Sequence, residues 1–137
     1  MLTLAIIINT MITRFEDLRC WQEARQLVKE IYLISEQGKL CKDFDTKSQL
    51  KRAALSIMNN IAEGFGKYSS REFIRYLDIA NNSASEVKSI LYVLLDLNYL
   101  ELERIVELQV KADGVKALCL ALIKHLVTRD KPKHLNT

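Results

Sequence analysis

Glycine and proline are scarce in this chain of 137 residues, which contains four glycines and one proline, Pro132, close to the C-terminus. Tight turns between strands rely on both residue types, because glycine reaches positive φ and proline presets the turn conformation. Long stretches without either residue therefore argue against a sheet and favour helices. The length suits one domain with a single core.

Residues that build catalytic and metal centres are also few. The chain has two histidines, and its three cysteines (Cys20, Cys41 and Cys119) lack the Cys-x-x-Cys spacing of a zinc site. It has no glycine-rich phosphate loop, no nucleophile elbow and no Glu-x-x-His pair of the di-iron bundles. We therefore predict a non-enzymatic cytoplasmic protein with reduced thiols, no metal, no other cofactor and no small-molecule substrate.

The hydrophobic run at residues 1–12 (MLTLAIIINTMI) is too short to cross a bilayer, which takes about 20 residues. It also lacks the basic region and cleavage site of a signal peptide, so we expect no membrane association. Two interpretations remain open. The segment is an extra apolar element that docks on the core or on a partner, or the start codon is assigned too early; Met11 as a natural beginning favours the second.

Four segments carry apolar residues at alternating steps of three and four, the repeat of an amphipathic helix. Their short links favour antiparallel neighbours. The predicted fold is an all-α, antiparallel up-and-down four-helix bundle over residues 13–128, followed by a flexible tail at 129–137. The four apolar stripes are Cys20, Ala24, Leu27, Ile31 and Ile34; Leu50, Ala54, Ile57, Ile61 and Phe65; Phe73, Leu77, Ala80, Ala84, Val87, Leu91 and Leu94; and Ile105, Leu108, Ala112, Val115, Cys119, Leu122 and Leu126.

Residues that favour helix ends flank these stripes. Thr13 begins a capping-box pattern before the first helix, Asp43 or Asp45 suits the start of the second, and Ser69 or Ser70 suits the third. Helix stops are expected at Gly38, at Gly64 and Gly66, and at Asn98.

Three of the helices carry apolar residues beyond their main stripe. A monomeric bundle needs one stripe per helix, so the surplus favours self-association. The alternative is a wide core stripe, which globular helices often have. The surplus residues are Trp21, Val28 and Tyr32; Tyr76, Ile90 and Leu97; and Leu102, Val106, Leu120 and Ile123.

The second helix also carries a polar row: Gln49, Arg52, Ser56, Asn60 and Glu63. It is either a solvated face or a network that pins this helix to the next. A hairpin turning near residues 67–68 would place Arg52 opposite Ser83 and within reach of Glu86. The same turn would place Glu63 near Arg71 or Arg75. We therefore predict contacts between Arg52 and Glu86 and between Glu63 and Arg71 or Arg75.

Positive charge is concentrated between Lys47 and Arg75, where six basic residues face two acidic ones, a net charge of +4, against +3 for the whole chain. Basic side chains at one end of a bundle could meet phosphates through counterion release. The alternative is an ordinary solvated turn. The candidate nucleic-acid contacts, to RNA or DNA, are Lys47, Lys51, Lys67, Arg71 and Arg75.

Three blocks of residues together resemble the four-helix-bundle family of 23S rRNA intervening-sequence proteins, over roughly residues 13–126. The blocks are Phe15-Glu16-Asp17-Leu18 with Trp21, Gln22 and Ala24; Ser48-Gln49-Leu50 with Arg52-Ala53-Ala54, Ser56-Ile57 and Asn60-Ile61-Ala62-Glu63-Gly64; and Glu72-Phe73 with Tyr76-Leu77, Ile79-Ala80, Ser83 and Glu86.

The resemblance implies a small bacterial bundle that assembles as a ring, typically a pentamer. It also implies that the recurrent polar positions are Gln49, Arg52, Asn60, Glu63, Ser83 and Glu86. A more distant similarity is to the basic, pentameric accessory protein of diversity-generating retroelements, which binds nucleic acid and a reverse transcriptase. This chain departs from the family at Met58, where proline is frequent, and its charge of +3 is well below that of the accessory proteins.

From these observations we expect a homo-oligomeric bundle that acts as an assembly or RNA-associated accessory protein. The alternative is a nucleic-acid-binding protein that uses the basic end around residues 47–75, in the manner of a reverse-transcriptase accessory.

Overall fold

The computed structural model describes residues 12–130, and every regular element in this range is helical. The prediction of an all-helical chain is therefore confirmed. None of these helices combines the length and the apolar character that a membrane crossing needs. The elements are a short 3-10 helix η1 (Phe15–Asp17), a short helix α3 (Gly38–Lys42), and four long helices, α2 (Arg19–Ser35), α4 (Phe44–Phe65), α5 (Ser70–Asp96) and α6 (Leu102–Arg129).

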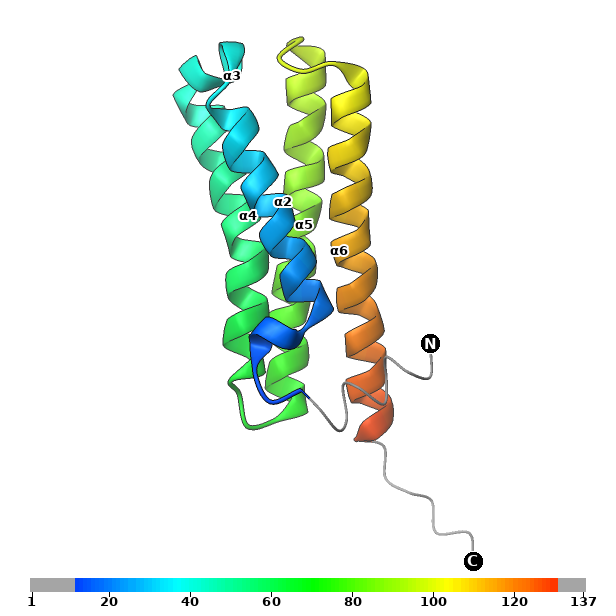
Figure 1. Cartoon of the computed structure of the whole chain (residues 1–137). Helices are drawn as coiled ribbons and strands as arrows, with labels where there is room; N and C mark the ends of the chain where they lie inside the picture. Colours follow the sequence, from blue (N-terminus) through cyan, green and yellow to red (C-terminus); the bar gives the residue numbers. More distant parts are fainter. Residues whose placement is uncertain (1–11, 131–137) are drawn as a thin grey trace, which may run out of the picture.

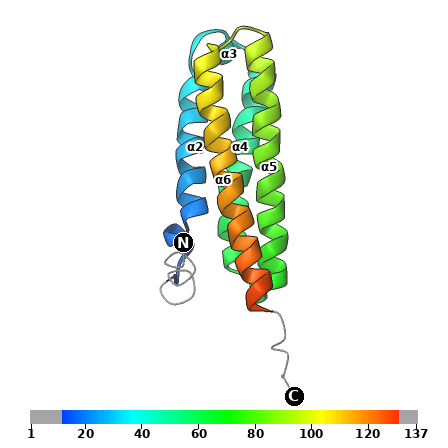
Figure 2. The same cartoon turned by 90° about the vertical axis from the view of Figure 1, so that its right-hand side faces the viewer.

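The four long helices lie side by side, and each runs back along the one before it (Figures 1 and 2). α4 packs against α5 and α5 against α6, while α2 contacts both α4 and α6. The connection from α4 to α5 lies at the end of the molecule nearest η1, and the connection from α5 to α6 lies at the end that carries α3 (Figure 1).

The predicted stripes form the core. Every stripe residue is buried except Phe65, which is partly buried with its ring edge-on to that of Phe73, at 6.0 Å between centroids. Three further core residues lie outside the stripes, so the repeat did not predict them. Ala53 is on α4, while Leu18 after η1 and Leu40 in α3 close the two ends of the core and are 3% and 1% exposed.

Two of the predicted helix caps are confirmed. At the start of α4 the carboxylate of Asp43 accepts a hydrogen bond from the backbone N–H of Thr46 (3.2 Å), and at the start of α5 the Ser69 hydroxyl accepts one from Glu72 N–H (3.2 Å). Each satisfies a backbone donor that the first turn of a helix leaves without a partner.

The predicted capping box at Thr13 is wrong. Residues 15–17 form a 3-10 turn, and α2 begins only at Arg19, after Leu18 in an extended conformation. The extended backbone allows Leu18 to enter the core, and the Gln22 side chain holds the turn by donating to the Glu16 carbonyl (2.9 Å). Burial of one apolar side chain therefore displaces the local capping pattern.

Three of the residues expected to stop helices, Gly38, Gly66 and Asn98, lie at turns, whereas Gly64 lies in a contact between helices. Gly38 has φ +53° and begins α3 instead of ending α2, which stops at Ser35, while Asn98 has φ 56° just after α5. Gly66 caps the end of α4 as expected. Gly64, in contrast, is a buried residue inside α4, where the helix meets α5.

The predicted boundaries of the domain fall at the edges of the described range. Residues 1–11 and 131–137, which hold most of the apolar extension and the tail, lie outside the described residues. Ile12 packs against the core, and α6 reaches Arg129, one residue beyond the expected limit of the bundle.

Candidate functional site

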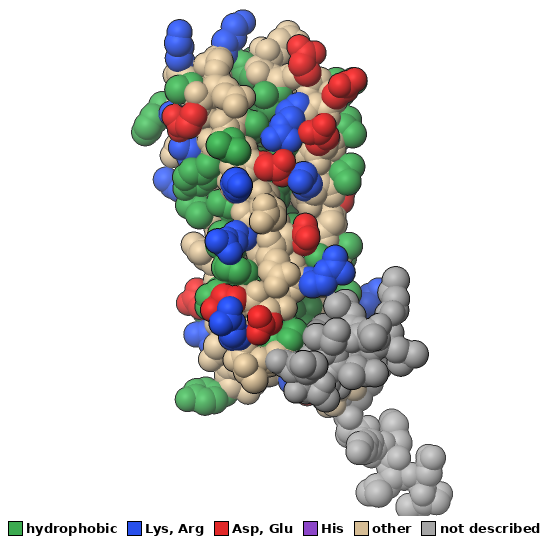
Figure 3. Space-filling view, in the orientation of Figure 1, with side chains coloured by type: hydrophobic (Ala, Val, Ile, Leu, Met, Phe, Trp, Pro, Cys, Tyr) green, Lys and Arg blue, Asp and Glu red, His purple; other side chains and the backbone are tan. Residues whose placement is uncertain are grey.

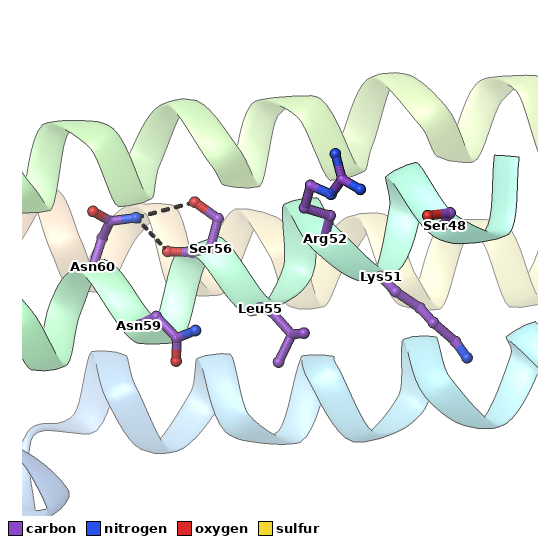
Figure 4. A pocket seen from close by; sticks show the side chains of 7 residues that line it. All are labelled: Ser48, Lys51, Arg52, Leu55, Ser56, Asn59 and Asn60. Atoms are coloured by element: carbon purple, nitrogen blue, oxygen red, sulfur yellow. Dashed lines mark hydrogen bonds between the residues drawn. The ribbon is translucent and has the colours of Figure 1, made fainter. Parts of the chain in front are cut away.

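The polar row of α4 makes a direct contact with α5 at its centre. The hydroxyls of Ser56 and Ser83 lie 2.8 Å apart, and Asn60 Nδ2 donates to the Ser56 carbonyl (2.7 Å) and to its Oγ (3.0 Å). Figure 4 shows the Ser56 and Asn60 side chains turned toward each other along α4. Two of the six predicted network residues, Asn60 and Ser83, are thus joined through Ser56, and these contacts link α4 to α5.

The two predicted contacts between α4 and α5 do not take the form of ion pairs. Within residues 12–130, neither Arg52 with Glu86 nor Glu63 with an arginine of α5 forms an ion pair, although Arg52 points toward α5 (Figure 4). Ser56, not Arg52, lies opposite Ser83. The facing residue on α4 is thus four positions, about one helical turn, beyond Arg52. The turn itself is where it was expected, because α4 ends at residue 65 and α5 begins at residue 70.

An open groove of about 530 Å³ runs along the outward side of α4. Its lining offers two cations, two hydroxyls and two amides and includes no carboxylate, so it suits a polar or anionic partner better than a cation. Leu55 supplies its one apolar side chain. The lining residues are Ser48, Lys51, Arg52, Leu55, Ser56, Asn59 and Asn60 (Figure 4).

The five basic candidates do not share one end of the molecule. Lys47 and Lys51 lie in the first turns of α4, whereas Lys67, Arg71 and Arg75 lie beyond its other end. At about 1.5 Å per helical residue, the 20 residues from Lys47 to Lys67 separate the two groups by about 30 Å. The expectation of a single basic end over residues 47–75 is therefore wrong, because α4 spans the bundle.

The first group, Lys47 and Lys51, makes contacts with other residues of the same chain. Lys51 Nζ lies 3.0 Å from the Glu36 carboxylate and 4.7 Å from the centre of the Tyr32 ring, while Lys47 Nζ donates to the Cys41 carbonyl (3.1 Å). The hydrogen bond from Lys51 lowers the pKa of Glu36 below its usual value. These lysines tie the start of α4 to α2 and α3.

The second group surrounds an aromatic turn. Lys67 Nζ and the Arg75 guanidinium lie 5.2 Å and 4.9 Å from the centre of the Tyr76 ring, and Arg75 also pairs with Glu72 (3.3 Å). Arg71 is exposed and makes no ion pair with any described residue. Tyr68, at the tip of the turn, is fully exposed. This turn is the more accessible of the two basic groups.

Tyr99 and Asp43, which are 56 positions apart in the sequence, form a hydrogen-bonded corner that was not predicted. The Tyr99 hydroxyl donates to Asp43 Oδ2 (3.0 Å), which also accepts from the Thr46 hydroxyl (2.9 Å). The hydrogen bonds from Thr46, followed by that from Tyr99, lower the pKa of Asp43, and the same contact raises the pKa of Tyr99. The corner anchors the start of α4 to the α5–α6 connection.

Replacing Asp43 with alanine should lower the Tm, and the loss should depend on pH. Because the pKa of Asp43 is lower in the folded chain than in the unfolded chain, the ionised carboxylate stabilises the fold above its unfolded value of about 4. That stabilisation is lost as the pH falls through the folded pKa. Thermal unfolding of both proteins between pH 7 and pH 2 measures the difference in Tm, which should narrow below about pH 4; a constant difference would contradict the assignment.

The cysteines form no metal cluster within the described residues, and all three are free. Cys20 on α2 and Cys119 on α6 are both buried in the core, and a hydrogen bond with Cys20, together with burial, raises the pKa of the Cys119 thiol. Cys41 is partly exposed. The buried thiols act as small apolar side chains in the contact between α2 and α6.

Comparison with known proteins identifies a family, and solved structures share the fold. The sequence pattern of the 23S rRNA-intervening sequence protein family matches residues 16–121. A crystal structure of a protein of unknown function from the S23 ribosomal protein family of Bacteroides thetaiotaomicron has a similar fold, with a TM-score of 0.71 and 24% sequence identity over 77% of this chain and 95% of that one. No curated protein matches the chain.

Proposed function

Since the chain belongs to the 23S rRNA-intervening sequence protein family, we propose that it is a non-enzymatic, antiparallel four-helix bundle that works as a homo-oligomer, as an assembly or RNA-associated accessory protein. The observation that supports this most is exposed apolar surface. Tyr92, Leu102 and Val110 are 57%, 59% and 63% exposed, although the core is already closed by the four stripes. Apolar side chains left exposed on a folded chain mark interaction sites where they gather into a patch.

Some of the surplus apolar residues belong to a wide core stripe, and others are exposed and available for self-association. Trp21, Val28, Ile90 and Ile123 pack against the core, so a wide core stripe accounts for them. The exposed members account for the proposed interface: Tyr32, Leu97, Leu102, Val106 and Leu120.

Light scattering coupled to size-exclusion chromatography tests the proposal. We expect a mass that is a multiple of the 15.8 kDa chain, and five copies would match the ring that the family resemblance implies. A particle of one chain at every concentration would contradict self-association.

The α4–α5 turn supports a second candidate, contact with single-stranded nucleic acid. Tyr68 offers an exposed ring for stacking on a base, and Lys67 and Arg71 beside it offer charge to the adjacent phosphates. On the face shown in Figure 3, basic and acidic side chains are interspersed, so that face carries no field of one sign. The turn is therefore the best-supported place for such contact, including in a reverse-transcriptase accessory role.

Binding of a single-stranded RNA oligonucleotide, followed by fluorescence anisotropy at several salt concentrations, tests this candidate. Binding should weaken steeply with salt, and the double substitution K67E/R71E or the single substitution Tyr68→Ala should weaken it about tenfold. The matched control is K39E/K42E on α3, at the other end of the molecule, which should change binding less. Equal effects of the two charge reversals would contradict a site at the turn.

A further inference from the structure

An exposed apolar patch lies between α5 and α6, at the end of the molecule that carries α3. Lys88 on α5 accepts a hydrogen bond at its carbonyl from Gln109 on α6 (3.0 Å), which fixes the two helices side by side. Tyr92 is one turn from Lys88, and Val106 is one turn from Gln109, so both lie along the same groove. The patch consists of Tyr92, Leu102, Val106 and Val110, which are 57%, 59%, 51% and 63% exposed.

Acidic residues surround this patch. The segment 92–110 holds four acidic residues and one basic residue, Arg104, a net charge of −3. Arg104 pairs with Glu107 (3.0 Å) and reaches across to Glu30 on α2 (3.3 Å). The other acidic residues are exposed and form no ion pair with any residue between 12 and 130; they are Asp96, Glu101 and Glu103. We call these three residues, together with the apolar patch, the acidic face.

The opposite side of the same end, formed by α2, α3 and α4, is basic and aromatic. The segment 39–55 holds five basic and two acidic residues, a net charge of +3. Of the acidic residues, Asp43 is bound to Thr46 and Tyr99, and Asp45 is exposed. Three of the basic residues are exposed and form no ion pair within the part of the chain that the structure describes: Lys39, Lys42 and Arg52.

Exposed aromatic rings lie among these cations. Phe44, the first residue of α4, is 73% exposed, and Tyr32 on α2 is 38% exposed. Leu55, half-buried, lines the groove on the outward side of α4. We call the three apolar residues, together with Lys39, Lys42 and Arg52, the basic face.

The two faces lie on opposite sides of the bundle but at the same end. There α2, α3 and α4 stand to the left in Figure 1, and α5 and α6 stand to the right. Although both signs occur over the face in Figure 3, acidic side chains gather at its upper right, where α6 begins, and basic side chains stand at its upper left, over α3. Copies placed side by side, with their α3 ends in the same direction, therefore bring the acidic face of one against the basic face of the next.

We propose that the acidic face of one chain binds the basic face of a second copy. The inference deepens the proposed function, because it rests on self-association and names the two surfaces that carry it. Both faces offer exposed apolar side chains, and the unpaired charges around them are opposite in sign. Because the two surfaces differ, the contact is heterologous, and each added copy leaves one face of each kind open until a ring closes. This contact is compatible with the ring that the family resemblance implies.

Two variants of the full chain, each with one face blocked, test the pairing by light scattering and sedimentation over a range of concentrations. Val106→Lys places a cation in the acidic face, and Phe44→Glu places an anion in the basic face. Each should raise the dissociation constant at least about tenfold, because it brings like charges together. Each variant keeps its other face intact. A mixture of the two should therefore associate again, into particles of two or more chains.

The matched controls are Val127→Lys and Tyr68→Glu, which introduce the same charges at exposed residues at the other end of the molecule. They should leave the dissociation constant unchanged. Added salt should weaken association of the wild-type chain, because it screens the opposite charges of the two faces. Circular dichroism of each variant establishes that it is folded before its association is compared.

The outcomes separate this inference from the proposed function. A wild-type chain that is monomeric at every concentration overturns both. A wild-type oligomer that neither Val106→Lys nor Phe44→Glu disturbs overturns the pairing of the two faces and leaves the proposed function standing. Dissociation by only one of the two variants, or a mixture that stays as single chains, also overturns the pairing.

Discussion

Replacing Gly64 with alanine should lower the free energy of unfolding by about 2–3 kcal/mol, because the added methyl group has no room between α4 and α5. A Cβ at this position would lie 2.6 Å from Tyr76 Cβ and 2.9 Å from Phe73 Cδ2. Tyr76 Cβ is bonded directly to the backbone, so no rotation of the tyrosine side chain relieves the contact. The two helices must move apart, which loosens the packing around them.

A decrease in the free energy of unfolding would be informative, because alanine is a better helix former than glycine by about 1 kcal/mol. Without a steric clash, the substitution would therefore stabilise α4. Urea unfolding followed by circular dichroism measures the change. Gly66→Ala is the matched control, because a Cβ there meets nothing closer than 3.6 Å and the φ of −78° suits alanine. It should change the free energy of unfolding by no more than about 0.5 kcal/mol. Similar values for the two variants would show that α4 and α5 do not approach closely at Gly64.

Gly64 also shows why the sequence could not predict the register of α4 and α5. Read along the chain, it is one of two glycines near the end of a helix and is expected to stop it. Its actual role depends on Tyr76 and Phe73, which lie on another helix. The close approach at Gly64 sets how the two helices meet. Ser56 and Ser83 share a hydrogen bond, while Arg52 and Glu86 form no ion pair.

The periodic core, in contrast, could be predicted almost completely. Each stripe is a local pattern, and burial of one side of a helix follows from it without knowledge of the neighbours. The caps at Asp43 and Ser69 are local as well, and both are present. Local patterns gave a wrong prediction where burial of a side chain competed with them. The capping box at Thr13 does not form, and the chain near it is arranged so that Leu18 is buried in the core.

The candidate site could be predicted only in part, because sequence proximity is a poor guide to distance along a helix. Lys47 and Lys67 appear in one basic stretch, but α4 carries them to opposite ends of the bundle. Conversely, Tyr99 and Asp43 are far apart in the sequence and share a hydrogen bond. Ser56 and Asn60 could be placed on one side of α4 from their helical spacing. Ser83 was expected to face this row, but opposite Arg52 and not opposite Ser56.

Replacing Leu91 with alanine should lower the free energy of unfolding by about 2–5 kcal/mol. Leu91 is 0% exposed and lies on the core stripe of α5, which packs against both α4 and α6. Truncation removes buried apolar atoms and leaves a cavity that helices packed on two sides cannot easily fill.

The matched control for Leu91→Ala is Leu33→Ala, the same chemical change on α2 at a residue that is 54% exposed. It should cost about 0.5 kcal/mol or less in a single chain, because little apolar area is lost from the interior. Urea unfolding of both variants at several protein concentrations makes the comparison. The effect of Leu91→Ala should not depend on concentration, whereas a cost at Leu33 that grows with concentration would place that exposed leucine in a contact between chains. A small effect at Leu91 would contradict the core that the stripes define.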